Sequence, residues 1–287
     1  NPPENVCRST PIPPQSTGNP PPVIPSDPAD HSTESDRSAE GEMQRLLKSG
    51  GSPPVDSDPF EIDGRRLSPE RIVALLRPFM TERRVGRIQE VVAQRTRTVV
   101  PVIEGLVNTG NVSAVMRSAE ALGYQDLHVV QGDNERYKHS RRTAQGAQHW
   151  LDVWRWDGAE TCVGHFHERG FRVAAMHLDD RARPIGDLDF TEPTALVFGN
   201  EASGVSRRMR EAADATVVIP LAGFTESFNV SVAAALALYH AQQDRQNRQG
   251  HHADLTPEEQ ARLVARFCLR SVSNAEKIIA RKLKESD

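Results

Sequence analysis

Short apolar runs alternate with longer amphipathic segments through the middle and end of the chain. Residues 99–103, 127–130 and 195–198 are nearly continuous runs of valine, leucine, isoleucine and other apolar residues. Such runs are typical of strands that are buried on both faces of a parallel sheet. Segments 109–121 and 159–169 carry apolar residues at helical spacing between these strands. The alternation predicts an α/β fold with a parallel sheet and helices on both faces.

The remaining pattern completes the predicted order of elements. Further strands are predicted at 153–156, 171–176 and 215–219, and helices at 206–213 and 227–246. Two helices are expected before the sheet, one beginning at Ser68-Pro69 and one running from Thr81 to about Arg95. Two more are expected after it, over 257–267 and about 274–284, and the first begins with a capping box at Thr256.

Composition divides the chain into four regions. Residues 1–59 hold 13 of the 20 prolines, and 1–58 hold nine acidic and four basic residues, so we expect a disordered acidic tail. Residues 60–97 and 250–287 are predicted to be basic helical regions on either side of an α/β domain at 98–249. The second of these regions includes Arg266 and Arg270. From residue 59 on, 30 acidic and 31 basic residues nearly cancel, which leaves room for basic patches.

Arginine clusters are the candidate RNA-binding positions. On the second predicted helix, Arg95 and Arg97 extend an arginine-rich segment that outweighs its acidic residues, and a polar loop at 133–148 is also basic. These clusters form either a phosphate-binding surface or an ordinary solvated face. The candidate residues for RNA binding are Arg83, Arg84, Arg87, Arg141 and Arg142.

Cysteine usage and hydropathy limit the other classes of protein. The three cysteines, Cys7, Cys162 and Cys268, are scattered, which argues against a disulfide framework or a zinc site and fits a reducing compartment. The histidines show no metal-ligand spacing, so no metal is expected. No run of 18 apolar residues is present, so no membrane span is expected. We therefore expect a cytoplasmic protein.

Three polar loops at predicted strand ends carry the candidate chemistry. The first is Asn108-Thr109-Gly110-Asn111 with Arg117 behind it, the second is Gly199 to Gly204, and the third is Pro220 to Ser231. The carboxyl ends of parallel strands are where α/β proteins bind ligands. The chain lacks GxGxxG, GxxxxGK[ST] and GxSxG, so the common dinucleotide, triphosphate and serine-hydrolase sites are not indicated.

Together these loops resemble the motifs of the SPOUT superfamily of RNA methyltransferases, most closely its TrmH-like tRNA (guanosine-2′-O-)methyltransferase branch. The matching segments are NTGNVSAVMRSAEALG, LVFGNEASGVS and IPLAGFTESFNVSVAAALALY, in the order and spacing of that family. The resemblance covers about residues 83–249. It implies a carboxyl-terminal trefoil knot, a homodimer and S-adenosyl-L-methionine as the methyl donor, with tRNA as the partner. At Phe224, Thr225 and Glu226 the chain departs from the tRNA branch, which tends to carry Met, Val and Gln.

The resemblance also assigns residues to the site. It places the cofactor at Met176, Gly199, Glu201, Ile219, Leu221 and Phe228, and the reaction at Asn111, Arg117, Glu201, Ser227 and Asn229. The family is described with the motif-one arginine, here Arg117, activating the ribose hydroxyl. Because arginine does not readily lose its proton, an alternative is that Arg117 clamps the neighbouring phosphate.

The sequence leaves alternative roles open for four of these residues, and alternative functions for the protein. Asn111 and Asn229 are also suited to capping their helices, and Arg117 and Glu201 to being ordinary surface charges. The leading function is 2′-O-methylation of guanosine 18 in the tRNA D-loop. The alternatives are ribosomal RNA 2′-O-methylation and a catalytically silent SPOUT protein that only binds RNA.

Overall fold

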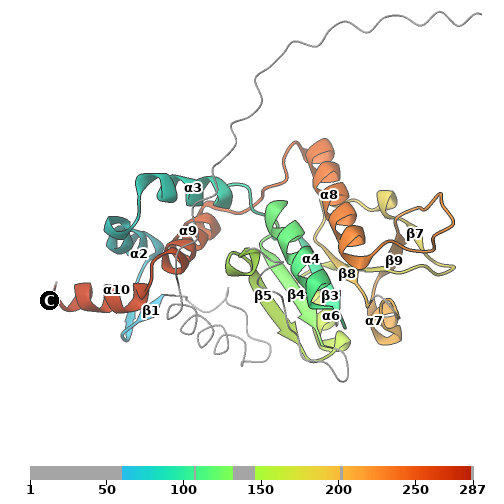
Figure 1. The fold of residues 1–287 in the computed structure, drawn as a ribbon, viewed down its shortest axis with the longest axis horizontal. Helices are drawn as coiled ribbons and strands as arrows, with labels where there is room; N and C mark the ends of the chain where they lie inside the picture. Colours follow the sequence, from blue (N-terminus) through green and yellow to red (C-terminus); the bar gives the residue numbers. More distant parts are fainter. Residues whose placement is uncertain (1–59, 107, 132–145, 201–202, 286–287) are drawn as a thin grey trace, which may run out of the picture.

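A seven-stranded parallel sheet forms the centre of the computed structural model, which describes residues 60–106, 108–131, 146–200 and 203–285 (Figure 1). The strand order is β5-β4-β3-β8-β6-β9-β7, and every neighbouring pair is parallel. The predicted α/β class with a parallel sheet is therefore confirmed. The strands are β3 (Val99–Glu104), β4 (Asp126–Val130), β5 (Asp152–Trp156), β6 (Arg172–Met176), β7 (Arg183–Pro184), β8 (Thr194–Phe198) and β9 (Ala215–Val218).

The central strands are buried along their whole length, as their continuous apolar sequences predict. Every residue of β3, β4 and β8 is buried, because helices cover both faces of a parallel sheet. The edge strand β7 was not predicted. It has only two residues, one of them Pro184, and proline is tolerated at a sheet edge because it cannot donate to the ladder.

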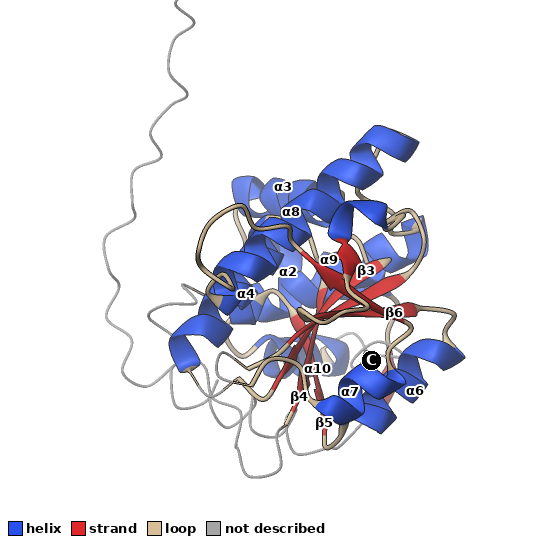
Figure 2. Ribbon diagram, turned by 90° about the vertical axis from the view of Figure 1, so that its right-hand side faces the viewer, coloured by secondary structure: helices blue, strands red, loops and turns tan. Residues whose placement is uncertain are grey.

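Helices cover the sheet on both sides, as Figure 2 shows. On one face α4 (Thr109–Ala121) and α8 (Val230–Gln249) pack together over a core that includes Leu196, Phe198 and Leu238. On the other face α6 (Ala159–Glu168) and α7 (Arg207–Ala212) cover a second core that includes Trp154, Phe166 and Met209.

The helices before and after the sheet share one core, which the sequence alone did not indicate. This helical lobe contains α2 (Pro69–Leu76), the short η1 (Arg77–Phe79), α3 (Glu82–Val92), α9 (Pro257–Ser271) and α10 (Ala275–Lys284). It also contains a small antiparallel hairpin of β1 (Glu61–Ile62) and β2 (Arg65–Arg66). Ile72, Leu76, Phe267 and Ile279 meet in its interior. The two terminal regions thus form one structural unit.

Helix boundaries differ from the prediction where tertiary contacts decide them. The helix expected to reach Arg95 ends at Val92, because Arg95 turns into a buried ion pair. The helix expected to end at residue 267 continues to Ser271, since Phe267 and Cys268 are buried in the lobe. The capping box at Thr256 is confirmed, with Thr256 and Glu259 bonded reciprocally.

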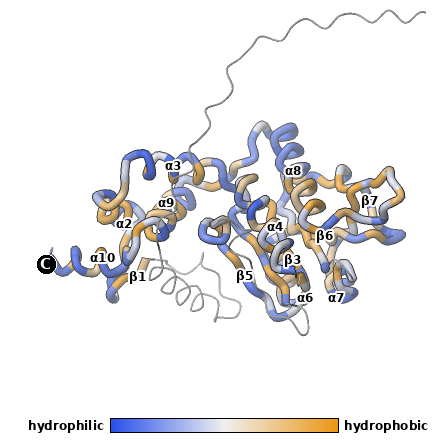
Figure 3. The backbone as a smooth tube through the Cα atoms, in the orientation of Figure 1, coloured by the Kyte–Doolittle hydropathy of each residue, from blue (hydrophilic) through white to orange (hydrophobic). Residues whose placement is uncertain are grey.

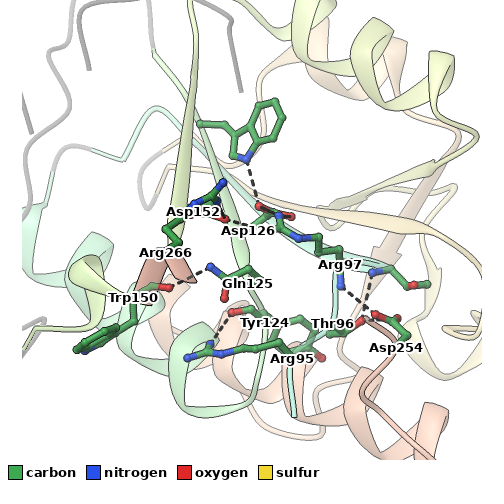
Figure 4. Close-up of polar contacts among 12 residues, drawn as sticks. Arg95, Thr96, Arg97, Tyr124, Gln125, Asp126, Trp150, Asp152, Asp254 and Arg266 are labelled. Atoms are coloured by element: carbon green, nitrogen blue, oxygen red, sulfur yellow. Dashed lines mark hydrogen bonds and ion pairs between the residues drawn. The ribbon is translucent and has the colours of Figure 1, made fainter. Parts of the chain in front are cut away.

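A buried cluster of charged residues joins the helical lobe to the sheet (Figure 4). Asp152, at the start of β5, accepts from Arg97 at 2.7 Å, from Arg266 at 3.0 Å and from Arg270 at 2.9 Å. Arg97 also pairs with Asp126, at the start of β4. Burial by itself raises the pKa of Asp152, but the three guanidinium groups hold it well below its usual value. α9 is therefore fixed to the amino-terminal edge of the sheet.

A second group of contacts continues this junction. Asp254, in the loop before α9, accepts from Thr96 at 2.6 Å and pairs with the buried Arg245 of α8 at 2.7 Å. Arg95 pairs with Glu120 of α4 at 2.6 Å. Each buried guanidinium faces a carboxylate, as buried charges require. The sheet, α4, α8 and the lobe are thereby held in one arrangement.

No helix among the described residues combines the length and apolar character needed to cross a membrane. The predicted tail at 1–59 and most of the predicted loop at 133–148 lie outside the described residues. Of that loop, the structure describes only 146–148, which include the start of η2 (Ala147–His149). Like β7, η3 (Ile185–Asp187) is a short element that the sequence did not indicate.

Candidate active site

The carboxyl ends of four neighbouring strands lie along one edge of the sheet. β3, β8, β6 and β9 end at Glu104, Phe198, Met176 and Val218. The register pairs Phe198 with both Ile103 and Met176, so the ends of β3, β8 and β6 are level with one another. Ligands of parallel sheets bind at this edge. The three predicted loops follow three of these four strands and are thus brought to one place.

The second loop closes on itself through its backbone. The Asn200 and Gly204 backbones exchange two hydrogen bonds of 3.0 and 2.8 Å. Gly204 has φ +67°, and a Cβ on Gly199 would lie 2.2 Å from the Gly204 carbonyl carbon and the Val205 nitrogen. Since real Cβ atoms do not approach so closely, the turn requires glycine at position 199. The two glycines therefore fix a tight turn directly after β8.

The second loop is also tied to the first. The Asn200 side-chain nitrogen donates to the Gly105 carbonyl oxygen at 2.7 Å, just after β3. Below it the buried Glu104 carboxylate accepts from both the backbone nitrogen (2.8 Å) and the hydroxyl (2.7 Å) of Ser206, which caps α7. These contacts hold the ends of β3 and β8 together.

His177 adds a contact that the sequence analysis missed. It directly follows β6, and its backbone nitrogen donates to the Val217 carbonyl oxygen of β9 at 3.1 Å. Its ring lies against Gly204, where an added Cβ would be 2.8 Å from Nδ1. Burial, with help from Arg210, lowers the pKa of His177 and so favours the neutral ring. Its position just after a predicted strand was the one available signal.

Two of the predicted reaction-centre residues meet across 118 positions of sequence. The Asn229 side-chain nitrogen donates to the Asn111 side-chain oxygen at 3.3 Å. Asn229 also caps α8, where its oxygen accepts from the Ser231 nitrogen at 2.9 Å and hydroxyl at 2.6 Å. The capping role of α4 belongs instead to Asn108, which accepts from Gly110 at 2.8 Å. Asn111 is therefore not the cap residue, and it is directed to the start of α8.

The other predicted reaction-centre residues are not joined to this pair. Arg117 is exposed on α4, six residues after Asn111, and a helix turns by about 240° over that spacing. Ser227 is exposed in the loop before α8. Glu201 lies outside the described residues. Within the described part of one chain, Asn111 and Asn229 are thus the reaction-centre residues in contact.

Comparison with known proteins agrees with this arrangement. The sequence model of the SpoU rRNA Methylase family matches residues 98–239. The tRNA (guanosine(18)-2′-O)-methyltransferase of Aquifex aeolicus is 32% identical over 170 residues, which are 59% of this chain and 81% of that protein. The enzyme of the same name from Escherichia coli K12 is 34% identical over 168 residues, 58% of this chain and 73% of that protein. This chain belongs to the SpoU methylase family.

A solved structure supports the same assignment. The crystal structure of the A. aeolicus TrmH/SpoU tRNA modifying enzyme superposes with a TM-score of 0.62 at 30% identity, covering 67% of this chain and 98% of that one. The family resemblance drawn from the three motifs is confirmed.

The residues expected to hold S-adenosylmethionine, the methyl donor of SpoU methylases, line the same edge. Met176 and Ile219 are partly buried and pack against the core below α4 and α8. Leu221 is partly buried, and Phe228 is exposed beside the start of α8. The tight turn at Gly199 presents backbone groups at the same edge, directly after Phe198, which is the register partner of Met176. Backbone hydrogen-bonding groups beside an apolar surface suit an adenosyl group, so the residues fit this cofactor.

The arginines of the predicted RNA surface divide into two groups. Arg83, Arg84 and Arg87 are exposed on α3, as expected. The Arg84 guanidinium lies 5.1 Å from the Trp150 ring centre, and Arg87 pairs with Glu90 at 3.3 Å. Arg141 and Arg142 lie outside the described residues.

For four other basic residues the prediction of an exposed basic surface is wrong. Arg95 and Arg97 were expected on an exposed face, and Arg266 and Arg270 on a basic terminal helix. The guanidinium groups of all four instead form ion pairs with the carboxylates of Glu120, Asp126 and Asp152 inside the molecule. Helical periodicity cannot separate these positions from a solvated face, because their partners come from distant strands and helices. No group of three potential metal ligands occurs among the described side chains.

Proposed function

We propose that this protein transfers a methyl group from S-adenosylmethionine to the 2′-hydroxyl of guanosine 18 in the tRNA D-loop. The observation that carries the proposal is the Asn111–Asn229 contact, which joins the first and third motifs. The glycine turn of the second motif follows a strand that ends at the same edge of the sheet. The names of the relatives that are 32–34% identical favour tRNA over ribosomal RNA as the substrate.

The chain's own residues supply binding and orientation in this reaction. The bound cofactor supplies an electrophilic methyl group, held by the loops after β6, β8 and β9. Asn111 and Asn229 orient the ribose through their amide groups. Arg117 binds the phosphate next to the target ribose, because a guanidinium stays protonated and forms paired hydrogen bonds to phosphate. Positioning of this kind provides much of the rate in an in-line transfer.

The active form in this proposal is a homodimer. Val232, Leu236 and Tyr239 lie at spacings of four and three on α8 and are 46%, 42% and 53% exposed. A helix buries such a stripe against a partner, and a second copy of the chain is the proposed partner. Sedimentation velocity of the purified protein tests this, and a monomer at micromolar concentration would contradict it.

The proposed chain path includes a trefoil knot within residues 98–249. Its support is the strand order: β8 lies between β3 and β6, β9 lies beyond β6, and α8 then returns to pack on α4. The tail at 1–59 and the regions 60–97 and 250–287 flank this domain. The proposed place of action is the cytoplasm, where tRNA is modified.

RNA binding is proposed to use the exposed arginines of α3, together with Arg141 and Arg142. The exposed basic residues of α10, among them Lys277 and Arg281, extend this surface. Phosphate contacts release counterions, so RNA affinity should fall steeply as salt concentration rises. A flat salt response would show that these arginines form only a solvated face.

The decisive experiment is transfer of tritiated methyl groups from S-adenosylmethionine to unmodified tRNA and rRNA transcripts, with the modified nucleotide mapped. Methylation at guanosine 18 of tRNA is expected. Methylation of rRNA alone would show that the substrate is ribosomal RNA, which is the first alternative. Calorimetry with S-adenosylmethionine addresses the second alternative, since failure to bind the cofactor would indicate a silent RNA-binding protein.

A further inference from the structure

A polar cleft lies at the far ends of α4 and α8, away from the candidate active site. It encloses about 790 Å³ between α3, the last turn of α4, the last turns of α8 and the loop 250–253. In Figure 1 the loop that leaves α8 runs back toward the helical lobe. In Figure 3 the last turns of α8 are hydrophilic. None of the residues assigned to methyl transfer lines this cleft.

The charges of the cleft cancel in pairs. Arg87 pairs with Glu90 at 3.3 Å, and Arg95 pairs with Glu120 at 2.6 Å. The polar side chains that remain are glutamine amides and the imidazoles of two histidines. They include the side chains of Gln94, Gln243, His251 and His252. Burial, with help from Arg245, lowers the pKa of His252 to about 4, so that ring is uncharged at pH 7.

The chemistry of this lining indicates which part of an RNA chain, phosphate or base, the cleft can bind. A site for a bare phosphate needs an excess of positive charge, which the cleft lacks. Amide side chains form hydrogen bonds with the edges of nucleobases, and an exposed imidazole such as that of His251 stacks on a base. The chemistry therefore fits an unpaired nucleobase.

The position of the cleft separates it from the target ribose. From Asn111 to Leu122 α4 rises by about 16 Å, and from Asn229 to Gln243 α8 rises by about 21 Å. A single nucleotide does not span that distance. A base in the cleft thus belongs to a different nucleotide from the one at the Asn111–Asn229 contact.

We infer that the cleft binds the base of an unpaired RNA nucleotide other than the one that is methylated. This inference rests on the proposed function. Because α4 and α8 are rigid and packed together, they fix the separation between the two nucleotides. The fixed distance between the cleft and the active site then determines which ribose receives the methyl group.

The test uses the full chain with Gln94→Ala and Gln243→Ala combined. Neither side chain has a hydrogen bond to another described residue, so the variant should fold. The matched control is Gln89→Ala with Asn247→Ala, two exposed positions on α3 and α8 that lie outside the cleft. Fluorescence anisotropy measures affinity for an unmodified tRNA transcript over a salt series, and calorimetry measures S-adenosylmethionine affinity.

The cleft variant is expected to bind tRNA about tenfold more weakly than the control, as loss of base contacts predicts. The dependence of affinity on salt should stay the same, because no phosphate contact is removed. Cofactor affinity should also be unchanged. Equal tRNA affinity in variant and control, or a reduced salt dependence, would overturn the inference.

Methyl transfer by the wild-type chain separates this inference from the proposed function. A wild type that methylates tRNA, with cleft variants that bind as the control does, overturns the cleft inference alone. A wild type that binds RNA through the cleft but transfers no methyl group overturns the proposed function alone.

Discussion

Replacing Asp152 with asparagine should destabilise the protein strongly although the side chain keeps its size. Asp152 is fully buried and is shared by Arg97, Arg266 and Arg270 at 2.7–3.0 Å. The substitution removes the one carboxylate that all three share. Arg97 retains Asp126, but Arg266 and Arg270 lose their carboxylate partner at this junction.

The magnitude follows from the cost of unpaired buried charge. Breaking a buried ion pair by removing one partner costs about 3–5 kcal/mol. A domain is stable by about 5–15 kcal/mol in total, so this is a large share. With a urea slope of about 2–3 kcal/mol per molar, the unfolding midpoint should fall by about 1–2 M. Because the pKa of Asp152 in the folded state is lowered, its contribution is present above pH 3.8 and is lost as the pH falls further.

Urea unfolding at pH 7, followed by tryptophan fluorescence, measures this effect. All three tryptophans, Trp150, Trp154 and Trp156, lie at or beside β5, so their emission reports on the junction. The control is Asp157→Asn, an exposed residue just beyond the opposite end of the same strand, which should change stability by less than about 0.5 kcal/mol. If the two variants differ by less than about 1 kcal/mol, the buried cluster does not fix α9 to the sheet.

Three other changes have expected outcomes. Gly199→Ala should weaken S-adenosylmethionine binding by at least about tenfold in calorimetry, because its Cβ would lie 2.2 Å from the Gly204 backbone. The control Gly164→Ala, whose Cβ meets nothing within 4 Å, should leave S-adenosylmethionine affinity unchanged. Equal cofactor affinities of the Gly199→Ala and Gly164→Ala variants would contradict the reasoning. Arg117→Lys should lose most methyl transfer while keeping cofactor affinity, since lysine cannot form the paired contact; near-normal turnover would remove Arg117 from the mechanism. Because His252 has a folded pKa of about 4 against 6.5, its contribution to stability is full above pH 6.5 and is lost as the pH falls toward 4. The urea midpoint of His252→Gln should therefore fall less between pH 7 and pH 5 than that of the wild type, and equal falls would refute this.

The sequence alone determined the fold class, the family and most of the secondary structure. Continuous apolar runs are read directly as buried strands, because side chains on both faces of a parallel sheet lose contact with water. Glycine turns and helix caps are local as well, so Thr256 and Gly199 could be placed without knowing their neighbours. The spacing of three such loops was enough to identify the family.

Only the tertiary structure decided which polar residues belong together. Asn111 and Asn229 are 118 positions apart, and nothing local distinguishes a cap residue from one that reaches another helix. Arg97 and Arg266 look like surface cations in sequence, and they are buried because Asp152 lies between them in the fold. Such pairings depend on where distant elements pack, while hydrophobic periodicity records only whether a position faces the interior. The sequence therefore determined the elements of this protein, and the packing of the lobe against the sheet determined its charged junction and its polar cleft.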